Sequence, residues 1–143
     1  MHQTAPTLDA ARAVRVMHFA LVAGVLLAGG VFVFLVQFSR FPPNAAPTVG
    51  TILAVGSIAL VAFAAVFLRR RIPERRFDET PDSYWSMPEH RGAAIVLWAV
   101  TEAAALFGLM GYFLTSSPAP GVAAGIAAVA LIVFRPSNLE GAA

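Results

Sequence analysis

The chain has no cysteine, no lysine and few charged residues of any kind. Of its 143 residues, 13% are charged and 58% are hydrophobic, whereas about one quarter of an average soluble domain is charged. The lack of cysteine excludes disulfides and thiolate metal sites. Because so few polar groups cannot cover a globule in water, the composition indicates a protein whose solvent is the lipid bilayer.

The basic residues are all arginines, and they lie beside apolar runs. The chain has ten of them and a net charge of +2. A basic balance is typical of some nucleic-acid-binding proteins, but this placement fits membrane topology better than a DNA-binding surface. We therefore expect no nucleic-acid partner.

Four apolar runs have the composition of membrane helices. They cover residues 14–38, 48–68, 92–115 and 119–134. At ~1.5 Å per residue the first three reach across the ~30 Å hydrocarbon layer, and the fourth is short for a span. The first run is also too long for the apolar part of a signal peptide, which favours an uncleaved helix. The sequence predicts a single all-α domain, a four-transmembrane-helix bundle.

The arginines orient this bundle. Only Arg40 lies on one side of the predicted helices, and the other side carries Arg12, Arg15, Arg69, Arg70, Arg71, Arg75, Arg76, Arg91 and Arg135. Positive charge concentrates on the cytoplasmic side of membrane proteins. We expect both termini and the polar segment 69–91 to be cytoplasmic, in a multi-pass protein of the bacterial inner membrane.

Segment 69–91 is the only sizeable polar stretch between the runs. It is expected to be a solvated loop that fixes topology and touches anionic headgroups. A docking surface for a cytoplasmic partner, built on Arg69, Arg70, Arg71, Arg75 and Arg76, is the alternative. Tyr84 and Trp85 are expected to rest at the membrane interface as amphipathic anchors.

Small residues recur at helical spacing and predict where helices approach closely. Helices in lipid associate through such faces, because the hydrophobic effect gives them little reason to meet. The faces comprise Gly24, Ala28, Ala104, Gly108, Gly111, Gly121 and Gly125. They suit a tight bundle, a homo-oligomer or association with other membrane subunits.

Glu102 is a lone carboxylate near the middle of the third run. A charge at this depth is costly, so apolar surroundings favour the neutral acid, and an intramembrane acid is a functional-site hypothesis by default. We expect Glu102 to bind H⁺ or Na⁺, with oxygens of Ser57 and Thr101 nearby and His18 as an accessory group closer to the headgroups. The alternative is a structural role, in which a protonated Glu102 bonds to Ser57 or a backbone carbonyl and joins two helices.

Residues 88–114, PEHRGAAIVLWAVTEAAALFGLMGYFL, resemble the last hairpin arm of the rotor-ring proteolipids of rotary ATPases, especially the vacuolar type. The segment has a Pro-Glu pair and the pattern A-x-x-E-x-x-A-L-F-G-L, which covers Pro88, Glu89, Ala99, Glu102, Ala105, Leu106, Phe107, Gly108 and Leu109. In that family the glutamate binds the ion moved as the ring turns, so the resemblance implies this role for Glu102.

Catalytic and metal-binding patterns are missing from the sequence. No two of His, Asp and Glu fall at helical spacing within one run, so no metal site is expected, and no cofactor is expected either. The chain has no zinc-protease, hydrolase or nucleotide-loop motif. We expect ion handling by an oligomer or, as the alternative, a structural subunit of a larger membrane complex, and no enzyme.

Overall fold

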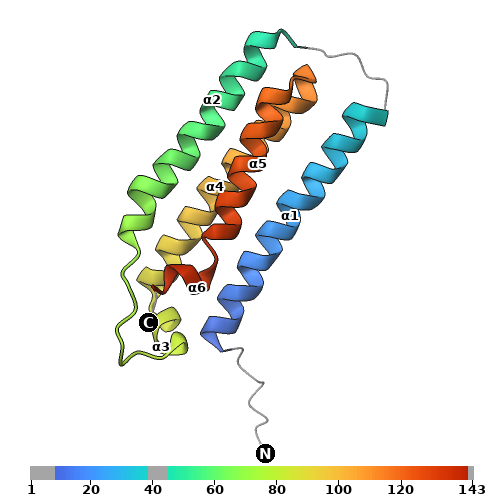
Figure 1. The fold of residues 1–143 in the computed structure, drawn as a ribbon. Coiled ribbons are helices and arrows are strands. Elements are labelled where there is room, and N and C mark those ends of the chain that lie inside the picture. Colours follow the sequence, from blue (N-terminus) through green and yellow to red (C-terminus); the bar gives the residue numbers. More distant parts are fainter. Residues whose placement is uncertain (1–8, 39–44, 142–143) are drawn as a thin grey trace, which may run out of the picture.

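The computed structural model describes residues 9–38 and 45–141, and all regular structure within them is helical. The elements are α1 (Ala10–Phe38), α2 (Pro47–Phe63), α3 (Pro81–Ser86), α4 (Pro88–Thr115), α5 (Pro118–Val133) and α6 (Pro136–Leu139). A π-helical segment, Ala64–Leu68, and a 3-10 turn, Arg69–Arg71, extend α2. Figure 1 shows the long helices side by side.

Three of these helices are long and apolar enough to cross a membrane. They are Ala10–Phe38, Pro47–Arg71 and Pro88–Thr115, with mean hydropathies of 2.7, 2.5 and 1.9. α5 is equally apolar but has 16 residues, which is about 24 Å of helix and less than the hydrocarbon thickness. The all-helical prediction is confirmed for the described residues, and the three long apolar helices indicate a membrane protein.

Five of the six α-helices begin with a proline, so their first residues differ from the first residues of the apolar runs in the sequence. The fixed φ angle and missing N–H of proline suit the first helical position. Segment 69–91, expected as a loop, therefore contains α3 and the first turn of α4. The hydroxyl of Thr80 accepts a hydrogen bond from the backbone N–H of Ser83 at 3.2 Å and caps α3.

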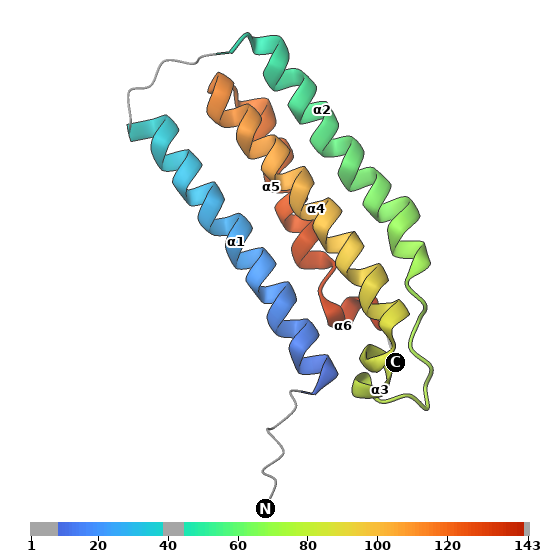
Figure 2. The same ribbon diagram turned by 180° about the vertical axis from the view of Figure 1, so that it is seen from behind.

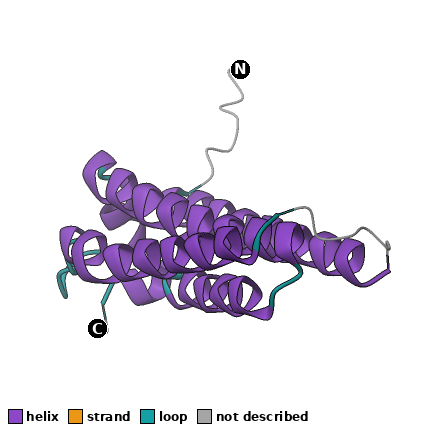
Figure 3. Ribbon diagram, turned by 90° about the horizontal axis from the view of Figure 1, so that it is seen from above, coloured by secondary structure: helices purple, strands orange, loops and turns teal. Residues whose placement is uncertain are grey.

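α4 is the central helix of the bundle. Its most apolar stretch is 44% buried, against 17% for the α2 span and 6% for α1. Figures 1 and 2 show α1 and α2 on its two flanks, with α5 in front of α4 in Figure 1 and behind it in Figure 2, and the view from above in Figure 3 shows the long helices nearly parallel. α1 is the most peripheral helix, and the Asp82 carboxylate accepts from the Ala11 N–H at its start, at 3.0 Å.

Both described ends of the chain lie at the same end of the bundle, together with α3 (Figure 1). We call this the arginine-rich end, because it carries the start of α1, the end of α2, the start of α4 and the end of α5. The described arginines are Arg12, Arg15, Arg69, Arg70, Arg71, Arg75, Arg76, Arg91 and Arg135. Arg40 lies outside the described residues.

α4 meets α5 and α2 at small residues. A Cβ atom on Gly108 would lie 2.6 Å from the Ala124 nitrogen, and one on Gly111 would lie 2.8 Å from Cβ of Pro120. Gly50 of α2 faces the Thr115 hydroxyl at 2.7 Å in the same way. These distances leave no room for a side chain. At Gly108 the backbones of α4 and α5 meet directly, whereas Gly111 and Gly50 make room for side chains of the neighbouring helix.

The other expected packing residues divide into two groups. Ala104 is fully buried, Ala28 is half-buried, and Gly121 lies against the ring of Tyr112. Gly24 and Gly125 differ from expectation, because within the described part of the chain nothing lies within 4 Å of where their Cβ atoms would be. Their small size therefore serves no contact among the described residues.

Candidate functional site

Glu102 lies at the middle of α4, as the fifteenth of its 28 residues, and is half-buried. It shares a face with residues that meet α1. Trp98, one turn earlier, has its ring 5.0 Å from that of His18, and Phe113 pairs with Phe32 at 5.3 Å. Because residues at these helical spacings share a face, Glu102 lies along the α1–α4 interface.

The predicted oxygen partners of Glu102 are bonded elsewhere. The Ser57 hydroxyl donates to the carbonyl oxygen of Ala104 at 2.7 Å, and the Thr101 hydroxyl donates to that of Leu97 at 2.8 Å. Within residues 9–38 and 45–141 the structure gives the Glu102 carboxylate no hydrogen bond and no ion pair. Ser57 therefore joins α2 to the α4 backbone, and not to the acid as expected.

The two sides of α4 explain this separation. Ala104 and Gly111 mark the side toward α2, since a Cβ atom on Gly111 would also lie 3.1 Å from the Leu53 Cβ. Glu102 is two residues before Ala104, which is about 160° away around a helix. That Ser57 and Thr101 share an ion with Glu102 stays a prediction.

His18 is buried between helices of the bundle. It is 7% exposed, and its Nε2 lies 2.9 Å from the carbonyl oxygen of Leu131 in α5. A carbonyl only accepts, so Nε2 carries the hydrogen. His18 thus lies inside the bundle beside Trp98, and its expected place closer to the headgroups than Glu102 stays a prediction.

His18 and Trp98 together cap the C-terminal end of α5 with hydrogen bonds. The indole Nε1 of Trp98 donates to the carbonyl oxygen of Phe134 at 2.7 Å, one turn from the Leu131 carbonyl bonded by His18. The last carbonyls of a helix have no partner within it. α5 ends before it reaches the arginine-rich surface (Figure 1), and side chains of α1 and α4 supply the missing donors.

A second buried polar cluster at the arginine-rich end was missed by sequence reasoning. Trp85 Nε1 donates to Glu140 Oε1 at 2.8 Å, and Arg75 Nε lies 3.7 Å from the other carboxylate oxygen. The Tyr84 hydroxyl donates to the Pro73 carbonyl at 2.6 Å. Tyr84 and Trp85 are fully buried, which corrects their expected place at the membrane interface.

Burial also changes the acid–base behaviour of this cluster. It raises the pKa of the Tyr84 phenol above its ordinary value of 10.0; Arg69 partly opposes the effect, and the negative charges of Glu140 and Glu79 add to it. The phenol thus keeps its proton and its bond to Pro73 at neutral pH. In the sequence, this cluster is marked only by two aromatic residues, Tyr84 and Trp85, within a polar segment. The partner of Trp85, Glu140, lies 55 residues farther along the chain.

The described residues hold no group of three or more His, Cys, Asp and Glu side chains suited to a metal ion. The site that remains is therefore the Glu102 carboxylate at the α1–α4 interface, with buried His18 one turn nearer the arginine-rich end. No family model, no curated protein and no solved structure matches the chain.

Proposed function

We propose that Glu102 binds and releases a proton within the membrane, at the interface of α1 and α4. The observation that carries this proposal is a half-buried carboxylate at the middle of an apolar helix, without a bonding partner among the described residues. A structural acid at this depth is expected to have its oxygens bonded. An acid that changes its protonation state needs an oxygen left open.

A proton fits this site better than a sodium ion. A hard cation is held by several oxygens, and the hydroxyls predicted to share the ion, of Ser57 and Thr101, already donate to carbonyls of α4. A proton needs only the carboxylate itself. Neutral Glu102 is also compatible with the apolar helix in which it lies, Pro88–Thr115.

His18 is the group suited to pass the proton toward the arginine-rich end. It contacts Trp98, which precedes Glu102 by one turn. Its Nε2 bonds to the Leu131 carbonyl, and within the described residues Nδ1 has no hydrogen-bond partner. Histidine serves as a proton shuttle in many proteins.

The wider assembly belongs to the same proposal. Clustered arginines favour a cytoplasmic arginine-rich end in a bacterial inner membrane, with α5 completing a four-helix bundle although it is short. The resemblance of residues 88–114 to rotor-ring proteolipids supports ion binding at Glu102 in an oligomer.

Carbodiimide labelling tests this function, because the reagent modifies protonated carboxyls in apolar surroundings. We expect labelling at Glu102 at neutral pH in reconstituted protein, and loss of that adduct in Glu102→Gln. Glu89→Gln is the matched control, since Glu89 is exposed at the start of α4. Labelling confined to exposed acids, with none on Glu102, would remove the proposal.

A structural subunit of a larger membrane complex is the second candidate. Its support is the outward face of α1, where Phe19, Leu27 and Phe38 are each 72% exposed, and the open glycines Gly24 and Gly125. Such a face is suited to another membrane helix. Purification in mild detergent separates the two ideas, since a partner-free monomer counts against this one and leaves proton binding standing.

A further inference from the structure

The seam between α2 and α4 carries two hollows on the outside of the bundle. A hollow of about 170 Å³ near the arginine-rich end is lined by Leu68, Arg71, Gly92, Ala93 and Val96. Farther along, an apolar groove of about 460 Å³ is lined by Ile52, Leu53, Gly56, Ala59, Leu60 and Phe107. Figure 2 shows the two helices running side by side along this seam.

The two hollows lie on one line. Leu60 in the groove and Arg71 in the hollow are eleven positions apart on the α2 span, as are Phe107 and Val96 on α4. On α4, which is α-helical throughout, eleven residues are about three turns and return to the same face, about 16 Å along the axis. Phe63 and Phe67, exposed and paired at 5.5 Å, lie between them on α2. The seam is therefore apolar for most of its length and cationic at one end.

Arg71 gives this seam its chemical character. The other residues of its hollow are apolar, and within the described residues the Arg71 side chain has no ion pair and no hydrogen bond. Arg69 and Arg75, by contrast, bond to Asn138 and Glu79 carbonyls. The hollow also has free space, because nothing lies within 4 Å of a Cβ atom built on Gly92.

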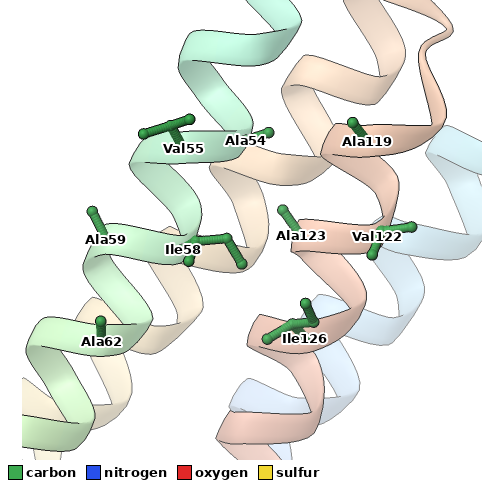
Figure 4. Close-up of a pocket in the computed structure, with 9 residues that line it drawn as sticks. All are labelled: Ala54, Val55, Ile58, Ala59, Ala62, Ala119, Val122, Ala123 and Ile126. Carbon is green, nitrogen blue, oxygen red and sulfur yellow. The ribbon is translucent and has the colours of Figure 1, made fainter.

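A second groove, between α2 and α5, has no charged residue in its lining and so differs from the α2–α4 seam. It has about 440 Å³ and nine lining residues, all alanine, valine or isoleucine, as Figure 4 shows. Any acyl chain fits such a surface equally well, so it cannot select a headgroup. Of these two grooves, the one at the α2–α4 seam is accompanied by a positive charge.

We infer that the α2–α4 seam binds an anionic phospholipid, with the phosphate at Arg71 and an acyl chain along the groove toward Phe107. The charge of an unpaired arginine complements the phosphate, and the apolar run beyond it complements the chain. Glu102 lies on the opposite side of α4, toward α1, so this site does not depend on the proposed proton chemistry.

Native mass spectrometry of the protein released from nanodiscs tests this site. Phosphatidylcholine discs that also contain phosphatidylglycerol supply both lipids, and we expect preferential retention of phosphatidylglycerol. Arg71→Gln should weaken that retention about fivefold, because one arginine near an anionic surface contributes on the order of 1 kcal/mol. Arg70→Gln is the matched control, since Arg70 is exposed and lines neither hollow.

A second pair of variants removes space instead of charge. Gly92→Leu fills the hollow and should also lower retention, whereas Gly24→Leu, at another open glycine, should not; circular dichroism checks that both keep their helices. The inference fails if phosphatidylcholine is retained equally, or if Arg70→Gln acts as strongly as Arg71→Gln. It also fails if inorganic phosphate displaces the lipid, which indicates a free-anion site, or if a second copy of the chain covers the seam.

Discussion

The two halves of α4 are held in different ways. From Pro88 to Thr101, neighbouring elements are joined to it by aromatic and polar side chains, such as the contact of Trp98 with His18 and its bond to Phe134. From Ala104 to Thr115, α2 and α5 approach it at small residues, down to 2.6 Å from a Cβ position at Gly108. Hydrogen bonds and close approach are the two ways in which helices associate in lipid, and this chain separates them along one helix.

Glu102 lies at the change between these two halves. Toward the arginine-rich end, buried polar side chains bond to carbonyls, and toward the other end small residues dominate the contacts, with the Ser57–Ala104 hydrogen bond among them. A carboxylate here is near enough to His18 and Trp98 to avoid a wholly apolar setting, yet outside the closely packed glycine contacts. The comparison explains why an acid at mid-helix does not disrupt the α4–α5 contact.

The largest effect is expected from a side chain placed in the small-residue half. Gly108→Leu forces atoms into the backbone of Ala124 and should lower the free energy of unfolding by about 3 kcal/mol or more. Gly125→Leu, at an open position on α5, should change it little. Denaturation in mixed micelles followed by circular dichroism measures both, and equal losses would show that the close contact is not the cause.

A smaller loss is expected from the polar half. His18→Leu leaves the Leu131 carbonyl without its donor and should lower the free energy of unfolding by about 2 kcal/mol, the cost of a buried unpaired polar group. Phe19→Leu, next in the chain but 72% exposed, is the control. If His18→Leu is as stable as the control, water takes the place of the histidine as donor to the Leu131 carbonyl, and the His18 hydrogen bond does not hold the polar half of α4.

The smallest effect is a pH dependence from Tyr84. Because burial raises its pKa, the folded protein keeps the phenolic proton where the unfolded chain has lost it. Stability should be constant up to about pH 10 and then fall by at most about 1.4 kcal/mol per pH unit, until the folded pKa is passed. The chain has no lysine or cysteine to titrate in this range.

Tyr84→Phe is the control for this measurement. It removes the titrating group, so its stability profile should be flatter above pH 10, although the lost bond to the Pro73 carbonyl lowers stability at every pH. If both proteins lose stability with the same slope above pH 10, another group causes the loss and deprotonation of Tyr84 does not contribute to it.

The long helices were predictable because they follow from the apolar runs alone, and the contacts at Gly108 and Gly111 followed from their spacing. The polar half was not predictable. The bonds of His18 and Trp98 end on carbonyls of α5, and every helix has such carbonyls at its end. Which donors reach them depends on where α5 stops against α1 and α4, and no local pattern carries that information.

The candidate site divides in the same way. The mid-helix position of Glu102 can be counted from Pro88, whereas its partners cannot. Ser57 was expected at a similar depth, and the structure places it level with Ala104 but on the other side of α4. Depth follows from residue number, but the angle around the bundle depends on which helices are neighbours.

The bond between the Asp82 carboxylate and the Ala11 N–H bears on how the protein is made. This bond stabilises the start of α1, and its acceptor lies 71 residues later in the chain. During synthesis α1 leaves the ribosome long before that acceptor exists, so it must enter the bilayer on its apolar character alone. The contact that holds the start of α1 therefore forms only after α3 has been synthesised.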